Sequence, residues 1–367
     1  MSRKVKVGVV GCGNISSIYF ENLTQVFLNV EVFACCDLDK TRVEEAAEKW
    51  GIPNIMTLDE ILECNEIEII LNLTTPQTHY SICKKALEAG KNVYVEKPLS
   101  LSFEEGRELV ELAKSKNLLL GGAPDTFMGA GIQTCKKLIE DGYIGEPLAA
   151  TAFMMCRGHE SWHPDPEFYY KKGGGPMFDM GPYYLTALVN LMGGVSEVCS
   201  MGRKSFDERT ITSEKKYGNK VEVEVDTHIA GLLRFNSNAI GTIITSFDVL
   251  DAHLPCIEVY GSRGTLLVPD PNTFGGPVKL LTMDGEGFKE IPLTHIYAEN
   301  SRGIGVSDMA KCILNGGKNL ASADLTCHIL EIMTAFEKSD KAKEYYKMET
   351  KLGRVESLSS DLIKGEV

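Results

Sequence analysis

The sequence lacks the patterns that mark membrane proteins, metal sites and disulfide-bonded secreted domains. No apolar run approaches the length that spans a membrane, and no leader precedes the first strand-like run, which begins near Lys4. The eleven cysteines never form a Cys-x-x-Cys pair and mostly lie inside apolar runs, which is typical of free thiols in a reducing compartment. We therefore expect a cytoplasmic protein without a disulfide framework or a zinc site.

Positive charge is also scarce. The chain has 38 Lys and Arg against 51 Asp and Glu, a formal net charge of −13, and its basic residues form no patch. This balance disfavours nucleic acid and anionic membranes as partners. Since 367 residues are many for one hydrophobic core, we expect two domains.

The first strand-like run, residues 4–10, leads directly into a glycine turn and a helical stretch. The turn reads Gly11-Cys12-Gly13-Asn14-Ile15-Ser16. Gly11 permits the tight turn, Gly13 lets the backbone approach a pyrophosphate, and the helix N-terminus supplies N–H groups. Ser16 stands where the dinucleotide fingerprint has its third glycine, which weakens the match. We expect a dinucleotide to contact Gly11, Gly13, Asn14 and Ile15.

An acidic residue ends the second strand-like run. Asp37 follows Gly13 by 24 positions, about where a carboxylate binds the ribose hydroxyls of a dinucleotide. A carboxylate there repels a ribose phosphate, so NAD is favoured over NADP, although nearby Arg42 keeps NADP as the second option. The structural alternative is that Asp37 or Asp39 caps the helix predicted over residues 40–50.

Polar residues also end two later strands of the expected sheet. These residues are Thr74, Thr75, Pro76 and His79 after the first, and Glu96 and Lys97 before Pro98 after the second. Ligands bind at such strand ends in open parallel sheets, so we expect these side chains along the dinucleotide. His79 can equally be a structural hydrogen-bond partner, and a Glu-Lys pair beside a proline is often only a surface turn. Ser100 is the expected cap of a helix over residues 101–116.

Six strand-like runs alternate with helices over residues 1–122, which predicts a doubly wound parallel α/β sheet. After residue 122 the pattern changes, and antiparallel-type runs dominate from residue 195 to residue 291. We expect residues 123–367 to form an α+β domain on one large, open, mostly antiparallel sheet. The charged segment 206–219 is expected as an exposed hairpin loop, and the tail after Glu349 as an extended edge or a frayed end.

A predicted helix over residues 176–192 carries candidate chemistry. Asp179 and Tyr183 lie four residues apart, so they project from one helical face. A carboxylate and a phenol there can hold a sugar hydroxyl and move its proton. The structural alternative is that Asp179 caps the helix and Tyr183 packs in the core.

A loop rich in glycine, proline and aromatic residues precedes that helix. Trp162 suits stacking on a sugar ring, with hydrogen bonds at the rim of the ring from the flanking side chains of His159, Glu160 and His163. His159 and His163 suggest a metal, but no carboxylate or cysteine partner stands at a suitable spacing, so no metal is expected.

In order and spacing, these motifs resemble the glucose-fructose oxidoreductase, inositol dehydrogenase and rhizopine-catabolism (Gfo/Idh/MocA) family. The resemblance covers nearly the whole chain. It rests on Gly11-Cys12-Gly13, Thr75-Pro76 with His79, Glu96-Lys97-Pro98, the glycine run before Asp179, and the late runs Ile257 to Gly261 and Gly264 to Leu266. It implies a Rossmann domain followed by an open-faced sheet domain, through which the chain forms a homodimer or homotetramer.

The resemblance also implies the roles of site residues. Lys97 matches the catalytic lysine and Asp179 the aspartate of the second motif, whereas Tyr183 stands where the family usually has a histidine. A tyrosine of ordinary pKa near ~10 is a poor base, while the positive ring of NAD and desolvation would lower the pKa of Lys97. We therefore assign Lys97 as the base and Tyr183 as a hydrogen-bond donor or relay. Further substrate-side candidates are Asp125, Trp162, His163 and Arg302.

The expected reaction is NAD-dependent oxidation of a secondary hydroxyl on a sugar, glycoside or inositol ring. Lys97 would take the proton while the same carbon gives a hydride to the nicotinamide. One alternative is 3-oxidation of a glycoside with tightly bound, recycled NAD, which includes NAD-dependent glycosidase chemistry. Another is a non-catalytic sensor of NAD and sugar.

Overall fold

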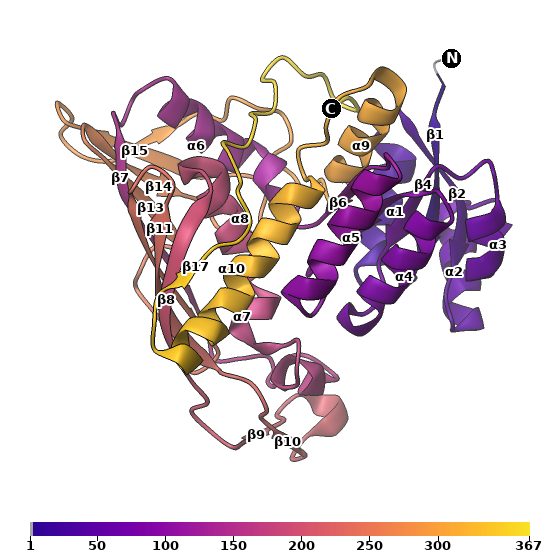
Figure 1. The fold of residues 1–367 in the computed structure, drawn as a ribbon, viewed down its shortest axis with the longest axis horizontal. Coiled ribbons are helices and arrows are strands. Elements are labelled where there is room, and N and C mark those ends of the chain that lie inside the picture. The colour runs from indigo at the N-terminus through magenta and orange to yellow at the C-terminus, as the bar shows by residue number, and fades with distance from the viewer. Residues whose placement is uncertain (1–2) are drawn as a thin grey trace.

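The computed structural model describes residues 3–367, and its first unit is a six-stranded parallel sheet (Figure 1). The strands are β1 (Val5–Val10), β2 (Val30–Cys36), β3 (Asn54–Ile55), β4 (Ile69–Asn72), β5 (Asn92–Val95) and β6 (Leu120–Gly122). The helices between them are α1 (Ser16–Gln25), α2 (Lys40–Trp50), α3 (Leu58–Glu63), α4 (Pro76–Glu88) and α5 (Phe103–Ser115). The predicted doubly wound α/β fold is confirmed.

The strand order of this sheet, β3-β2-β1-β4-β5-β6, reverses between β1 and β4. From β1 the chain winds outward through β2 and β3, and from β4 it winds outward in the other direction. Right-handed crossovers in opposite directions place helices on both faces of the sheet. Ligands of such sheets bind at the C-terminal ends of the two strands where the order reverses.

The second unit is built on a nine-stranded sheet, ordered β16-β15-β14-β13-β7-β12-β11-β8-β17. Its strands are β7 (Pro147–Met155), β8 (Val195–Arg203), β11 (His228–Phe235), β12 (Ile240–Ser246), β13 (Ile257–Gly261), β14 (Gly264–Val268), β15 (Val278–Thr282), β16 (Lys289–Ile291) and β17 (Tyr346–Lys347). Only the β7–β12 pair is parallel among the pairs of this sheet in the described chain. The expected large, mostly antiparallel sheet is therefore confirmed.

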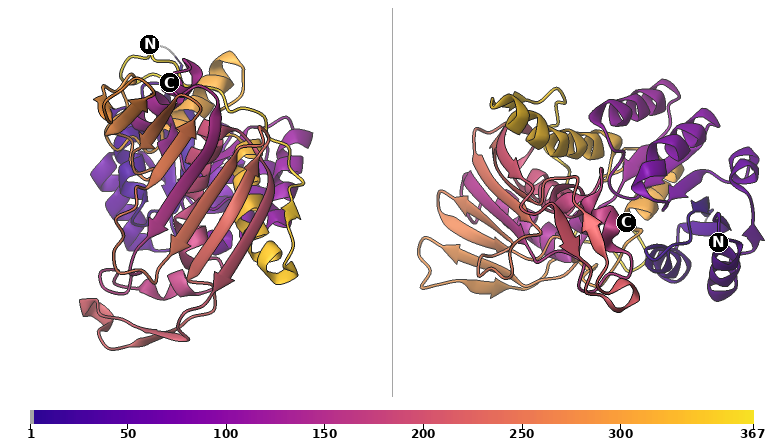
Figure 2. Two further views of the ribbon diagram at one scale, coloured as in Figure 1. Left: turned by 90° about the vertical axis from the view of Figure 1, so that its left-hand side faces the viewer. Right: turned by 90° about the horizontal axis from the view of Figure 1, so that it is seen from below.

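Helices cover one face of this sheet, and in residues 3–367 the opposite face is bare (Figures 1 and 2). Helices α6 (Ala130–Glu140), α8 (Gly181–Met192) and α10 (Ala323–Ala342) pack on the covered face. Helix α10 also contacts α5, so it lies between the two sheets. Helix α9 (Ile304–Asn315) returns to the first unit and packs against β1 and β6.

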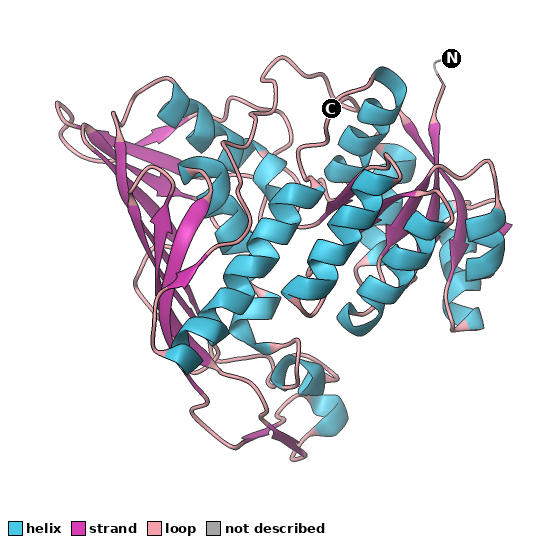
Figure 3. Cartoon of the chain, viewed as in Figure 1, coloured by secondary structure: helices cyan, strands magenta, loops and turns pink. Residues whose placement is uncertain are grey.

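Figure 3 shows the helices, strands and loops along the chain, and two helix boundaries differ from the predictions. Helix α5 is capped by Ser102, whose hydroxyl accepts from the Glu105 N–H at 3.3 Å, whereas the Ser100 hydroxyl donates to the Ser102 carbonyl. A 3-10 turn over Thr126–Met128 precedes α6. The predicted helix 176–192 is two helices, α7 (Gly175–Asp179) and α8, separated at Met180.

The charged segment near residue 210 contains a hairpin, as predicted, in which β9 (Glu208–Thr210) pairs with β10 (Lys220–Glu222). Short 3-10 turns occupy Pro166–Tyr170 (η2) and Glu214–Lys216 (η3). No helix within residues 3–367 is long and apolar enough to cross a bilayer.

The tail after Glu349 is neither frayed nor an edge strand, so that prediction was wrong. Val355 and Leu358 are buried, and the Leu358 N–H donates to the side chain of Gln133 at 2.9 Å. The buried Lys136 ammonium donates to the Asn190 side chain and to two carbonyls of the tail. Polar groups inside α6 therefore bind a segment that has little periodicity of its own.

Candidate active site

The glycine turn after β1 has the geometry that a dinucleotide requires. Gly11 has a φ of +99°, and a Cβ there would lie 2.8 Å from the backbone of Leu73. A Cβ on Gly13 would meet nothing within 4 Å, so the space in front of this residue is open. No side chain caps α1, which leaves its first N–H groups available to an anion. The turn therefore fits a pyrophosphate.

The two roles considered for Asp37 and Asp39 separate in the structure. Asp39 caps α2 by accepting from the Arg42 N–H at 3.2 Å. The Asp37 carboxylate instead accepts from the Cys12 N–H at 2.7 Å and from the Asp39 N–H at 2.8 Å. Arg42 is half exposed and lies 3.4 Å from Asp37. Asp37 is thus held beside the glycine turn, where a ribose hydroxyl can reach it.

The residues after β4 are organised by buried polar groups. Thr74 donates its hydroxyl to the Asn72 side chain at 2.7 Å, and Thr75 lies exposed at the same strand end. His79 is fully buried, with Nδ1 2.6 Å from the Pro98 carbonyl and Nε2 3.0 Å from the Thr74 carbonyl. Both ring nitrogens face backbone oxygens, which supports the structural alternative for His79.

The structure brings Lys97, Asp179 and Tyr183 together. The Lys97 Nζ lies 2.9 Å from Asp179 Oδ1 and 2.6 Å from the Asp179 carbonyl oxygen, and 5.3 Å from the centre of the Tyr183 ring. Glu96 accepts from the Tyr19 hydroxyl at 2.8 Å and so fixes the strand end that carries Lys97. Lys97 follows β5, Asp179 ends α7 and Tyr183 begins α8, so both units contribute.

The groups around Lys97 and Asp179 shift the pKa values of both side chains. Burial lowers the pKa of Lys97, but Asp179, Tyr183 and Glu96 together raise it above its ordinary value. Burial raises the pKa of Asp179, but Lys97 and His159 bring it down to about 2. In the ligand-free protein the pair is therefore an ammonium and a carboxylate. Burial lowers the Lys97 pKa as expected, and the effect of the positive ring of bound NAD on this pKa stays a prediction.

Asp179 and Tyr183 do not share one helix, because Met180 separates α7 from α8. Asp179 does not cap α8, since its two carboxylate oxygens face Lys97 and His159. Tyr183 is buried, and burial raises the pKa of its phenol, while Lys97 and Arg302 lower it in part. Tyr183 is therefore a neutral group that can donate a hydrogen bond.

The aromatic loop places His159 inside and Trp162 outside. His159 Nε2 lies 2.9 Å from Asp179 Oδ2, a contact that its sequence position does not suggest. Trp162 is 61% exposed, and its ring packs edge-on against His159 and His163. His163 accepts from the Asp165 N–H at 3.1 Å. The sequence suggests His159 as a hydrogen-bonding residue beside Trp162 or as a metal ligand, and nothing local signals its contact with Asp179.

Asp125 and Arg302 occupy different positions around the site. Asp125 is buried and accepts from the N–H groups of Gly303 at 2.8 Å and Gly305 at 3.2 Å, so it holds the start of α9. Arg302 donates to the Asn272 side chain at 2.7 Å and approaches Tyr183. The contacts of Asp125 favour a structural role, whereas Arg302 lies beside Tyr183, at the edge of the group formed by Lys97, Asp179 and Tyr183.

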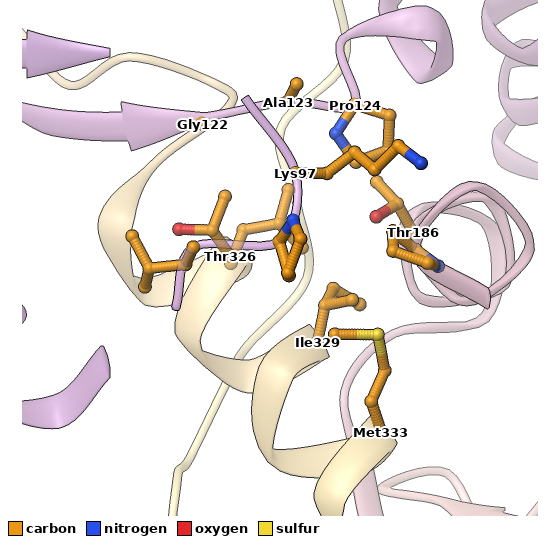
Figure 4. A pocket seen from close by; sticks show the side chains of 12 residues that line it. Lys97, Gly122, Ala123, Pro124, Thr186, Thr326, Ile329 and Met333 are labelled. Atoms are coloured by element: carbon orange, nitrogen blue, oxygen red, sulfur yellow. The ribbon is translucent and has the colours of Figure 1, made fainter. Parts of the chain in front are cut away.

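A cavity of about 10 Å³ lies beneath Lys97 (Figure 4). Its wall includes Pro124, Thr186, Ile329 and Met333, and the Lys97 side chain extends away from the last two. The volume holds no more than about one water molecule. A second cavity, of about 500 Å³, lies between Gly173–Gly175 and α10 and contains none of the predicted site residues. Neither cavity is the expected sugar site.

Comparison with known families defines the class of protein. The model of the family described as "Oxidoreductase family, NAD-binding Rossmann fold" matches residues 5–122. The model described as "GFO/IDH/MocA C-terminal domain" matches residues 132–267. The protein is therefore an NAD-binding oxidoreductase, as predicted. The chain belongs to the GFO/IDH/MocA family, which confirms the resemblance seen in its motifs.

Individual relatives support this assignment. An uncharacterised oxidoreductase of Schizosaccharomyces pombe is 32% identical over 197 residues. This match covers 52% of this chain and 52% of that one, about half of each. Myo-inositol 2-dehydrogenase of Thermotoga maritima is 28% identical over 264 residues, 71% of this chain and 74% of that one. The structure of levoglucosan dehydrogenase in complex with NADH and L-sorbose shares the fold with a TM-score of 0.80, at 21% identity, over 95% of this chain and 99% of that one.

The pH dependence of the free energy of unfolding tests the structural role of Asp125. Burial raises its pKa to about 6 from the ordinary 3.8, against the two N–H groups, which lower it. The folded protein thus keeps this proton up to about pH 6, whereas the unfolded chain loses it near pH 3.8. The contribution of Asp125 to the free energy of unfolding therefore falls between these pH values, by about 3 kcal/mol.

We expect Asp125→Asn, which keeps an acceptor oxygen for α9, to match the wild-type Tm at pH 4 and to exceed it at pH 7. Thermal unfolding of both proteins at the two pH values checks this, since all other groups titrate alike in both. A Tm difference that does not change with pH would contradict the prediction.

Proposed function

We propose that the protein oxidises a secondary hydroxyl on a sugar, glycoside or inositol ring, with NAD as the hydride acceptor. One observation carries the proposal: the Lys97 ammonium, the Asp179 carboxylate and the Tyr183 phenol converge beside the C-terminal end of β5. The names of the relatives, an inositol dehydrogenase and a levoglucosan dehydrogenase, point to the same substrate class.

The first unit would hold the cofactor. Gly11, Gly13 and the start of α1 would bind the pyrophosphate, together with Asn14 and Ile15. Asp37 would bind the adenosine ribose, because its carboxylate is fixed beside the turn. The rest of the cofactor would lie along the neighbouring strand ends, which carry Thr74, Thr75, Pro76 and Glu96. When bound, NAD supplies the site that accepts a hydride.

The second unit would hold the ring and Lys97 would move the proton. The Lys97 ammonium first releases its proton to solvent. The neutral amine then takes the hydroxyl proton as the carbon–hydrogen bond breaks, and Asp179 stabilises the ammonium that forms again. Tyr183 donates a hydrogen bond to a ring oxygen. Trp162 and His163 contact the sugar at the outer end of the site, and Arg302 approaches it from the side of Tyr183. Because Asp179 raises the pKa of Lys97, oxidation becomes faster as the pH rises.

Absorbance of NADH and mass spectrometry of each mixture test this function. Purified protein is incubated with NAD or NADP and with free sugars, inositols or glycosides. We expect NADH to form with one of these classes and with NAD in preference to NADP. An oxidised or cleaved sugar without net NADH would instead indicate a bound, recycled cofactor, and the absence of any product would favour an NAD and sugar sensor.

We expect Lys97→Met to lower kcat by at least ~100-fold, because the variant has no group to take the hydroxyl proton. Affinity for NAD, measured by quenching of protein fluorescence, should change little. Lys318→Met is the control, since Lys318 is exposed and far along the chain in the α9–α10 connection. Normal turnover by Lys97→Met would refute the assignment.

We also propose that a second copy of the chain covers the bare face of the nine-stranded sheet. On this face an apolar row crosses four neighbouring strands at paired positions, namely Phe153, Ile244, Ala230 and Met201. Met201 is 78% exposed. Such a contiguous apolar surface is typical of a protein interface, and a two-fold axis lets it pair with itself.

We expect Leu232→Glu to shift the mass measured by light scattering from an oligomer to a monomer. Leu232 lies on the bare face, because its neighbours Gly231 and Leu233 are buried toward the helices. A carboxylate there would be buried without a partner in the interface. Ile363→Glu, at an exposed position in the tail, is the control. An unchanged mass for Leu232→Glu would place the interface elsewhere.

A further inference from the structure

Two groups share the carboxylate of Asp179. Lys97 Nζ lies 2.9 Å from Oδ1, and His159 Nε2 lies 2.9 Å from Oδ2. Lys97 follows β5 of the first unit, whereas His159 belongs to the loop between β7 and η2. The carboxylate is thus held from two sides by groups of two different segments, neither of them on its own helix.

The loop that carries His159 is firmly anchored. The Arg209 side chain of β9 donates to the Glu160 carboxylate at 2.8 Å, to the Arg157 carbonyl at 2.8 Å and to Asp248 at 2.7 Å. The His159 ring packs 4.1 Å from the ring of Tyr169. His159 is 9% exposed. Its position beside Asp179 is therefore built into the fold.

His159 uses its ring nitrogens differently from the other buried histidines. His79, His295 and His328 each have a hydrogen-bond partner at both nitrogens. His159 Nδ1 is buried and has no partner among the described residues, so Asp179 is the one polar group that orients this ring. A carboxylate needs a donor, which places the proton of a neutral His159 on Nε2.

We propose that His159 is a positioning residue for the Lys97–Asp179 pair. By donating its Nε2–H to Oδ2, it orients the carboxylate and takes up part of its charge. Asp179 then holds the Lys97 proton less strongly, because a carboxylate that accepts a second hydrogen bond attracts a neighbouring cation less. Lys97 can therefore act as a base. This role rests on the proposed function of Lys97.

Other titratable groups also face the pair. They are Glu96, Tyr183 and Tyr169 near Lys97, and Tyr169, Tyr170 and His163 near His159. None of these groups has a hydrogen bond to Oδ2 of Asp179 among the described residues, whereas His159 does. The proposed effect therefore depends on this one hydrogen bond, and a substitution that keeps the ring but removes its nitrogens isolates it.

Two variants of His159 make the test. His159→Phe keeps an aromatic ring against Tyr169 but donates no hydrogen bond, whereas the side-chain N–H of His159→Gln can reach Asp179 as Nε2–H does. We expect His159→Phe to lower kcat about ten-fold near neutral pH, with recovery at higher pH and with the KM for sugar changed less than about three-fold. His159→Gln should restore much of the loss. His253→Gln, at an exposed position, should match the wild type.

A second readout requires neither NAD nor substrate. Competitive acetylation with acetic anhydride, followed by mass spectrometry, measures how readily Lys97 loses its proton, with exposed Lys318 as the internal reference. We expect Lys97 to react about ten-fold more slowly in His159→Phe than in the wild type, and close to the wild-type rate in His159→Gln.

Unchanged acetylation of Lys97 in His159→Phe, or an unchanged pH profile of kcat, would overturn the inference. A protein that oxidises no sugar would refute the proposed function instead, and the acetylation rates would still decide whether His159 acts on Lys97 through Asp179.

Discussion

The ion pair between Lys97 and Asp179 is the interaction on which the site depends. The two groups come from separate units, and both side chains are largely buried, at 18% and 15% exposure. A buried charge without a partner is strongly unfavourable, so each group requires the other in place. Tyr183 lies beside this pair and His159 contacts it, so groups from both units meet at the pair.

Further polar networks around the pair hold the elements that carry it. Tyr19 fixes Glu96 at the end of β5, Asp125 fixes the start of α9, and Arg209 fixes the loop of His159. Each network joins segments from different parts of the chain, and each is buried. In a medium of low dielectric such hydrogen bonds are strong, and an unsatisfied group is costly, so the networks restrict the site to one arrangement.

The same electrostatics bear on the chemistry. The family and the matched domain establish an NAD-binding oxidoreductase, and Asp37 lies beside the glycine turn, where its carboxylate accepts from the Cys12 N–H. Asp179, however, stabilises the protonated form of Lys97, which opposes its use as a base. His159 contacts the other carboxylate oxygen, and its proposed role is to weaken the attraction of Asp179 for the Lys97 proton.

The sequence by itself determined the parallel sheet, the glycine turn, the acidic end of β2, the Lys97 motif and the second, mostly antiparallel sheet. These features follow from local periodicity and from motifs of a few residues, so they can be read without knowing the fold. Only the tertiary structure decided that Asp125 is a buried partner of α9, that His159 contacts Asp179, and that the tail packs onto Lys136. These features depend on which polar groups meet after distant segments pack together. The separation of α7 from α8 is different, because Pro182 in the first turn of α8 is a local signal for a helix start that the prediction of one continuous helix did not use.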